Sequence, residues 1–311
     1  MMTTLMLQFL AVRAGTAPEP MMVGRGVIST EYDVNGPTES WDGSMVFVRS
    51  CPGTLITKTI LCEARVTGSH WMAPTVLPFS GIYYDQNPQF SPDRKHLTFS
   101  SLRERGKGFS IWQVERSGAT WGAPRKLEAP INDQGDQLSA SESSTGNLYV
   151  ASTRRGQGEL FFFKSKDARY EAPVPIDAVN AVGYVADACV APDETYIIFT
   201  AIGGKDEFDA HGALYQRSDL YITFQQKGTW QTPIHLPRPI NTEATEANPT
   251  LSADGRNLFF SSDRGFMSKN LHNSVTYREI LDNIHTDHNG LGKIFKLKMA
   301  DVLKIASLSI K

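Results

Sequence analysis

An aromatic residue followed three positions later by proline recurs four times along this chain. The pairs are Trp71 with Pro74, Trp121 with Pro124, Tyr170 with Pro173 and Trp230 with Pro233. The successive spacings between the aromatic residues are 50, 49 and 60. Self-similarity at a period of about 20 to 50 residues is typical of repeat architectures. The chain is therefore expected to fold as an array of similar units.

Each unit also contains a turn signal followed by a short apolar run that alternates in the manner of a β-strand. These runs are MVFV from Met45, LTFS from Leu97, LYVA from Leu148, IIFT from Ile197 and LFFS from Leu258. Alternation beside Asp-Gly or Pro-Asp turns indicates β-hairpins. A further strand is expected in each unit shortly before the aromatic residue. Four short strands in a unit of about 40 to 50 residues are typical of a β-propeller blade.

The number of blades follows from where the units begin, near Glu31, Tyr84, Gln134, Tyr184 and Glu243. The fifth unit has no aromatic-proline pair, but residues 20–23 provide an apolar strand before the first unit. The sequence predicts an all-β, five-bladed β-propeller over residues 15–298, with the N-terminal strand closing the last blade and a helical insertion in blade 5. Residues 1–14 are interpreted as a tail or a degenerate signal and residues 299–311 as a tail. A sixth blade built from residues 1–13 and 299–311 is the alternative.

The charge and hydropathy of the chain restrict its partners. Its 311 residues carry a formal net charge of -2, and this balance argues against nucleic acid as a main partner. No run of about 18 apolar residues is present, so no transmembrane helix is expected. The apolar segment Leu5 to Val12 follows no basic residue, as a secretory signal would require. A cytoplasmic and an exported location both stay open, and a monomer is expected.

Two of the turn segments carry a resemblance to a known family. They are residues 87–93, which read NPQFSPD and lead to Phe99, and residues 248–255, which read NPTLSADG and lead to Phe260. The chain resembles the TolB-like β-propeller repeat family of bacteria over roughly residues 20 to 298. The resemblance implies a stand-alone periplasmic or exported propeller with no assigned activity. The chain differs from the family in insertions near 205–217 and 266–290 and in a basic last strand.

Charged residues recur at two positions of the repeat. Carboxylates at the expected start of the first strand are Asp85, Asp136 and Glu246, and arginines after the second strand are Arg103, Arg154 and Arg264. Both positions are expected at the same mouth of the propeller. An inter-blade belt of ion pairs is the favoured interpretation, because arginine and carboxylate pair readily. The alternative is a catalytic set, by analogy with five-bladed glycosidases that place carboxylates around a funnel.

The two insertions are predicted to lie at this same mouth, because both follow the second strand of a blade. The first contains His211, a further catalytic candidate, and the second contains His272, a candidate for ligand binding. Apolar residues spaced as on one helix face predict a helix capped by Asn273 or Ser274, and they are Tyr277, Ile280, Leu281 and Ile284. Long loops on a rigid scaffold are common binding sites, so Tyr277 and the three arginines are included as binding candidates.

His285, Asp287 and His288 are residue types that could bind a divalent metal, although their spacing matches no established metal motif. The favoured interpretation is that they are solvated loop residues. The favoured function is non-catalytic binding of a protein, peptide or glycan at the mouth with the insertions. The alternative is a hydrolase, or another small-molecule or carbohydrate-active enzyme, that uses the mouth carboxylates or a loop histidine.

Overall fold

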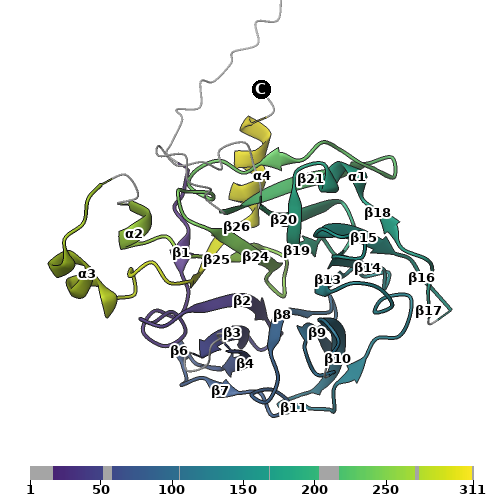
Figure 1. The fold of residues 1–311 in the computed structure, drawn as a ribbon, viewed down its shortest axis with the longest axis horizontal. Coiled ribbons are helices and arrows are strands. Elements are labelled where there is room, and N and C mark those ends of the chain that lie inside the picture. Colours follow the sequence, from purple (N-terminus) through teal and green to yellow (C-terminus); the bar gives the residue numbers. More distant parts are fainter. Residues whose placement is uncertain are drawn as a thin grey trace, which may run out of the picture.

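A computed structural model describes residues 17–51, 58–104, 106–167, 169–202, 217–269 and 273–309 of the chain. Five antiparallel sheets are arranged around one axis, as Figure 1 shows, and each sheet is one blade of a propeller. The innermost strands are β2, β8, β13, β19 and β24, one from each blade in chain order. The predicted five-bladed β-propeller is therefore confirmed.

The strands of each blade follow one another outward from the axis. Blade 1 contains β2 (Val34–Glu39), β3 (Met45–Cys51), β4 (Lys58–Ala64) and β7 (Thr75–Val76). Blade 2 contains β8 (Asp85–Phe90), β9 (His96–Ser101), β10 (Ser110–Ser117) and β12 (Arg125–Lys126). Blade 3 contains β13 (Gln137–Glu142), β14 (Leu148–Ser152), β15 (Glu159–Phe163) and β18 (Val174–Pro175).

The last two blades follow the same order. Blade 4 contains β19 (Tyr184–Val190), β20 (Tyr196–Ile202), β21 (Ser218–Gln226) and β23 (Ile234–His235). Blade 5 contains β24 (Glu246–Leu251), β25 (Asn257–Ser262), β26 (Lys293–Lys298) and β1 (Met21–Met22). In blades 1 to 4, the aromatic residue of the repeat lies on a small hairpin before the fourth strand. In chain order, these hairpins are β5 (Val66–Thr67) with β6 (His70–Trp71), β10 with β11 (Thr120–Trp121), β16 (Ser165–Lys166) with β17 (Arg169–Tyr170), and β21 with β22 (Thr229–Trp230).

Apolar side chains pack between each pair of neighbouring blades. The described residues form five buried clusters, one for each of the five blade-to-blade interfaces. Fully buried phenylalanines on the second strand are prominent members, and they are Phe47, Phe99, Phe199 and Phe260. Burying such a side chain stabilises the fold by roughly 1.5 to 3 kcal/mol. The strand faces of one blade are therefore buried only when the next blade is in place.

The N-terminal strand closes the ring, as predicted. Met21 and Met22 of β1 pair with Lys296 and Phe295 of β26, which gives the last blade its fourth strand. The N–H of Val23 continues the pairing with the carbonyl of Ile294 at 2.8 Å. Blade 5 is thus built from both ends of the propeller sequence, so its outer strand does not depend on a further repeat.

Four helices complete the described structure. They are α1 (Asp177–Asn180), α2 (Phe266–Lys269), α3 (Tyr277–Ile284) and α4 (Met299–Leu308). The helices α2 and α3 confirm the predicted helical insertion in blade 5. Residues 299–308 form a helix whose Val302 and Ile305 pack into the cluster between blades 4 and 5. This segment therefore provides no strand for a sixth blade. Among the described residues, no helix is long and apolar enough to cross a lipid bilayer.

Two aspartate substitutions, one in the closing strand and one directly after it, test the contribution of this segment to stability. Val23 is 6% exposed and Met21 is 59% exposed. Val23→Asp is expected to lower the free energy of unfolding by about 3 kcal/mol or more, because it places an unpaired charge in an apolar interface. Met21→Asp adds the same charge in solvent and should leave stability close to wild type. Urea unfolding followed by circular dichroism measures both, and equal effects would contradict the closure role.

Candidate functional site

The propeller has two faces with different loops. One face carries the segments between the second and third strands, including residues 263–269 and 273–292 of blade 5, and is called the insertion face. The predicted insertion of blade 4 lies outside the described residues, apart from Arg217. The opposite face carries the turns between the first and second strands and is called the turn face. Figure 1 shows α2 and α3 extending from blade 5 beyond the edge of the ring. The predicted placement of the blade 5 insertion between second and third strands is correct, and the insertion of blade 4 is flanked in the chain by β20 and β21.

Asp85 and Arg103 form a buried ion pair on the insertion face. Arg103 Nη2 lies 3.1 Å from Asp85 Oδ1 and 3.2 Å from Oδ2. The carboxylate also accepts hydrogen bonds from the hydroxyls of Ser80 and Ser101, both at 2.6 Å. Asp85 is fully buried and the Arg103 side chain is 10% exposed. The arginine and the two hydroxyls compensate the buried charge of Asp85. This carboxylate therefore has a structural role in blade 2.

Glu246 and Arg264 make the same pair in blade 5. Arg264 Nη2 lies 3.1 Å from Glu246 Oε1, and Ser262 donates to the same oxygen at 2.7 Å. Thr242 donates to Glu246 through both its backbone N–H and its hydroxyl. Burial raises the pKa of Glu246, although Arg264 and these hydrogen bonds oppose the rise. Two of the three carboxylate–arginine pairs are thus formed, but each lies within one blade and not between blades as predicted.

The third predicted pair, Asp136 with Arg154, is not formed. Gln137 is paired with Ser152 and occupies the position that the carboxylates hold in blades 2 and 5. The connection from Glu142 to Leu148 is one residue shorter than in those blades, so a count back from the second strand at Leu148 reaches Asp136 instead. Asp136 accepts a hydrogen bond from the backbone N–H of Phe109 at 2.7 Å.

Arg154 makes the same kind of contacts with the preceding linker as Arg103 and Arg264. It lies 3.3 Å from Asp133 and donates to the carbonyls of Pro130 and Ile131, both at 3.1 Å. Arg103 and Arg264 also donate to carbonyls of the linker that enters their blade. The guanidinium groups stack on phenylalanine rings of their own blades. The three predicted binding arginines therefore fix the linkers between blades.

The helix α3 is the most exposed apolar element among the described residues. Its hydrophobic side chains are 37% to 75% exposed, and they are Tyr277, Ile280, Leu281 and Ile284. Thr276 is the N-terminal cap of the helix. Its side chain accepts a hydrogen bond from the N–H of Glu279, and the Glu279 carboxylate accepts one from the N–H of Thr276. This capping box replaces the predicted cap at Asn273 or Ser274. The predicted periodicity is correct, but the apolar face is turned to solvent.

The candidate metal ligands lie at the base of this insertion. Asp287 is bound by Arg25, and Arg25 Nη2 lies 3.2 Å from Nε2 of His288. His285 is the C-terminal cap of α3. No group of three or more His, Cys, Asp or Glu side chains arranged to hold a metal is found among the described residues. The other two candidate histidines, His211 and His272, lie outside the described part of the chain.

The base of the insertion is held to the propeller by buried polar contacts. Asn289 donates to the carbonyl of Glu31 at 2.7 Å, across the interface between blades 5 and 1. Lys293 is fully buried, and its Nζ donates to Asn289 Oδ1 at 3.1 Å and to the carbonyl of Leu291 at 2.8 Å. Burial lowers the pKa of Lys293, while the nearby Asp33 opposes this effect. These contacts fix the segment that follows α3.

Hydrogen bonds run across the axis between the inner strands. Asn248 of blade 5 donates to Asn87 of blade 2 at 3.0 Å, and Gln89 donates to the carbonyl of Ala188 in blade 4 at 2.7 Å. Asp187, at the same position of blade 4 as Asn87, is 4% exposed. Burial raises its pKa from 3.8 to about 6, and the N–H of Asn248 opposes this only in part.

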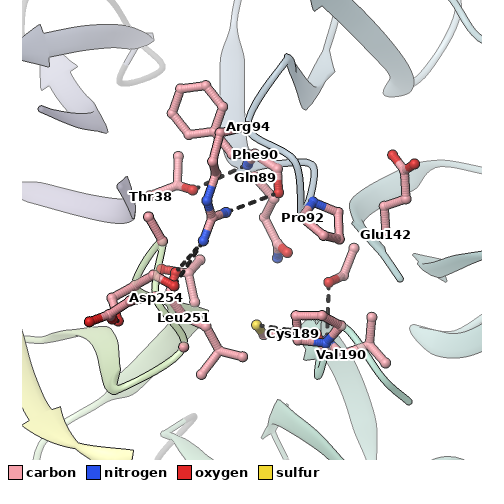
Figure 2. A pocket seen from close by; sticks show the side chains of 16 residues that line it. Thr38, Gln89, Phe90, Pro92, Arg94, Glu142, Cys189, Val190, Leu251 and Asp254 are labelled. Atoms are coloured by element: carbon pink, nitrogen blue, oxygen red, sulfur yellow. Dashed lines mark hydrogen bonds between the residues drawn. The ribbon is translucent and has the colours of Figure 1, made fainter. Parts of the chain in front are cut away.

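A cavity of about 180 Å³ opens on the turn face at the end of the axis. Figure 2 shows Arg94 reaching from blade 2 toward Leu251 of blade 5, with Cys189 below it. Arg94 Nη2 donates to the carbonyls of Leu251 and Ser252, at 3.1 and 2.9 Å. Through these contacts, Arg94 of blade 2 joins blade 5, which is not its neighbour in the ring. Burial raises the pKa of the Cys189 thiol to about 11, so this thiol stays protonated and unreactive.

The sequence interpretation missed one recurring inner-strand position, held by Asn87, Asp187 and Asn248, although a signal was present. Asn87 and Asn248 each lie six positions before the aspartate of a turn, and Asp187 lies six positions before Asp193 in the same way. Arg94 is the residue after Asp93 in its turn. Its contact with blade 5 depends on the closure of the ring, so a local pattern does not reveal it.

Removal of one carboxylate tests the ion-pair belt. Asp85→Ala leaves Arg103 buried without its partner, and the free energy of unfolding should fall by about 3 to 5 kcal/mol. Asp282→Ala is the control, since Asp282 pairs with Arg278 in an exposed i,i+4 pair and its loss should be nearly neutral. Urea unfolding at pH 7 measures both variants. An Asp85→Ala protein as stable as wild type would show that the pair is not structural.

The raised pKa of Asp187 predicts a pH dependence of stability. The unfolded chain releases this proton near pH 4, whereas the folded protein keeps it until about pH 6. Stability is therefore lost as the pH rises from 4 to 6, by about 3 kcal/mol for a shift of two units. Asp187→Asn cannot ionise and should be more stable than wild type by about this amount at pH 7.5, but not at pH 4. Equal differences at both pH values in urea unfolding would contradict this origin.

Comparisons with known proteins identify the fold. No family model and no curated protein matches the sequence. Among solved structures, the catalytic domain of the GH62 α-L-arabinofuranosidase of Coprinopsis cinerea is 13% identical with a TM-score of 0.51, covering 90% of this chain and 97% of that one. A putative TolB of Agrobacterium tumefaciens is 15% identical, with a TM-score of 0.48 and coverage of 74% and 70%. TolB of Acinetobacter baumannii is 12% identical with a TM-score of 0.45. The match covers 86% of this chain and 55% of that protein. At these identities the likeness to the arabinofuranosidase domain shows a shared fold alone.

Proposed function

We propose that this chain is a non-catalytic binding module that holds a protein partner on its insertion face. The observation that carries the proposal is the exposed apolar face of α3, formed by Tyr277, Ile280, Leu281 and Ile284. A row of large apolar side chains on one helix face, each exposed by more than a third, is typical of a surface that is covered by a partner. Tyr277 adds an aromatic anchor, a residue type enriched at binding hot spots.

The way α3 is held supports this role. Its first turn is closed by the capping box of Thr276 and Glu279, so the helix is formed before any partner binds. The segment after it is fixed by the pair of Arg25 with Asp287 and by Asn289. A preformed helix on a fixed base loses little conformational entropy on binding.

The candidate carboxylates favour binding over catalysis at this face. Asp85 and Glu246 are buried and each is paired with an arginine. General acid or base catalysis would need a carboxyl that can reach a ligand and exchange its proton. A hydrolase or carbohydrate-active enzyme stays the alternative for the loop histidines, His211 above all, but no described contact favours it.

We further propose that the chain is a TolB-like propeller. The support is the repeated Asn-Pro segment at Asn87 and Asn248, which the sequence shares with that family. Both asparagines have a left-handed backbone, with φ of 50° and 52°, and they lie at a bulge of the innermost strand. Asparagine tolerates this conformation better than most residues, which gives the motif a structural reason.

A photo-crosslinking residue placed at Leu281 tests the proposed surface in cells. A matched probe at Val76, which is 48% exposed on β7 of blade 1, is the control. We expect one protein to be captured through position 281 and not through position 76. The purified partner should then bind an Ile280→Ser/Ile284→Ser variant at least 30-fold more weakly, since each apolar anchor contributes roughly 1 to 2 kcal/mol. Capture of the chain by itself alone would indicate a homodimer, and an unchanged affinity of the variant would overturn the proposal.

A further inference from the structure

A cavity of about 530 Å³ lies between the outer parts of blades 3 and 4, away from the insertion face site. Its lining includes three aromatic rings and two carboxylates, from Tyr149, Phe162, Trp230, Asp177 and Glu194. The rings of Tyr149 and Trp230 are nearly perpendicular, at 87°, with centroids 6.1 Å apart. Aromatic faces beside carboxylates form a favourable environment for a cation. Among the described residues, no lysine or arginine lines this cavity.

The equivalent place between blades 1 and 2 is filled by an arginine of the protein itself. Arg116 lies opposite Trp121 in the β10–β11 hairpin, and its guanidinium carbon is 5.1 Å from the centroid of that ring. Arg116 Nη2 lies 2.9 Å from Glu63, and both side chains are at most 4% exposed. The cavity that remains there, lined by Glu63 and Trp121, measures about 360 Å³. This interface thus shows a guanidinium held between an aromatic ring and a carboxylate.

Blade 4 has glutamine where blade 2 has this arginine. Gln225 lies opposite Trp230 in the β21–β22 hairpin, in the same register as Arg116 opposite Trp121. Gln225 and Trp230 both line the larger cavity. The shorter, neutral side chain puts no cation over Trp230 at the position from which Arg116 covers Trp121, and no other described residue is seen to do so.

Glu194 supplies a negative charge to this cavity. It accepts hydrogen bonds from three neutral groups, the Thr145 hydroxyl and the Asn147 amide at 2.8 Å and the Tyr149 hydroxyl at 3.0 Å. Burial tends to raise the pKa of Glu194, but these hydrogen bonds outweigh it and hold the pKa below its ordinary value. The carboxylate is thus ionised at neutral pH, and neutral donors fix its position.

We propose that the cavity between blades 3 and 4 binds the guanidinium group of an arginine side chain presented by a protein partner. The partner's arginine would occupy the place that Arg116 occupies between blades 1 and 2. Trp230 provides the stacking surface, and Glu194 provides the charge. This site is separate from α3, so it can be tested independently of the proposed function.

The probe is N-acetyl-arginine N-methylamide, with the neutral citrulline compound of the same shape as its control. The indole N–H signal of Trp230 is followed by ¹H–¹⁵N NMR and assigned with Trp230→Phe. We expect a saturable shift with the arginine probe and at least tenfold weaker binding of the citrulline probe, because only the former carries a charge. Glu194→Gln should weaken the arginine probe about tenfold.

Gln225→Arg provides the sharpest variant, because it places an arginine opposite Trp230 in the register that Arg116 has opposite Trp121. Its own guanidinium should cover Trp230, abolish binding of the arginine probe and raise the thermal midpoint. Gln226→Arg is the matched control, since it adds the same charge at an exposed neighbouring position and should leave binding unchanged within about twofold. Equal shifts with the arginine and citrulline probes, or full binding by Gln225→Arg, would overturn the proposal.

Discussion

The strands of each blade bury their faces against the neighbouring blades, and this constraint governs the whole molecule. Five apolar clusters lie between the blades, and each draws its side chains from two of them. The ring is closed by β1, which pairs with β26 although more than 270 residues separate them. No blade can therefore be regarded as a stable unit by itself. The arginines of the insertion face add to this by fixing the linkers at the points where the chain passes from one blade to the next.

Much of this architecture could be predicted because the repeat is local. The spacing of the aromatic-proline pairs and the turn signals sets the number of blades, and the missing pair in the last unit indicates closure by residues 20–23. The helix α4 was less accessible to prediction. Met299, Val302, Ile305 and Ala306 lie on one face, but whether a short apolar segment becomes a strand or a helix depends on the surface available to it. That surface exists only once blades 4 and 5 have assembled.

The candidate site shows where a count along the sequence fails. Asp136 and Gln137 differ by one position, and a turn shorter by one residue decides which of them faces Ser152. The capping box of Thr276 with Glu279 is visible in the sequence, yet Asn273 and Ser274 are equally good caps by residue type. The cavity between blades 3 and 4 is a further example. Its significance depends on a comparison of Gln225 with Arg116, which requires the register of two hairpins.

The hydrogen bonds across the axis have a consequence for the molecule as a whole. Blade 2 reaches blade 5 through Asn87 and Arg94, and it reaches blade 4 through Gln89. Hydrogen bonds therefore join blades that are not neighbours in the ring at the centre of the propeller. Blade 2 takes part in all three of these contacts. The protein partner proposed for α3 and the arginine proposed for the cavity between blades 3 and 4 would contact different elements of the ring, so the binding of one would leave the surface for the other uncovered.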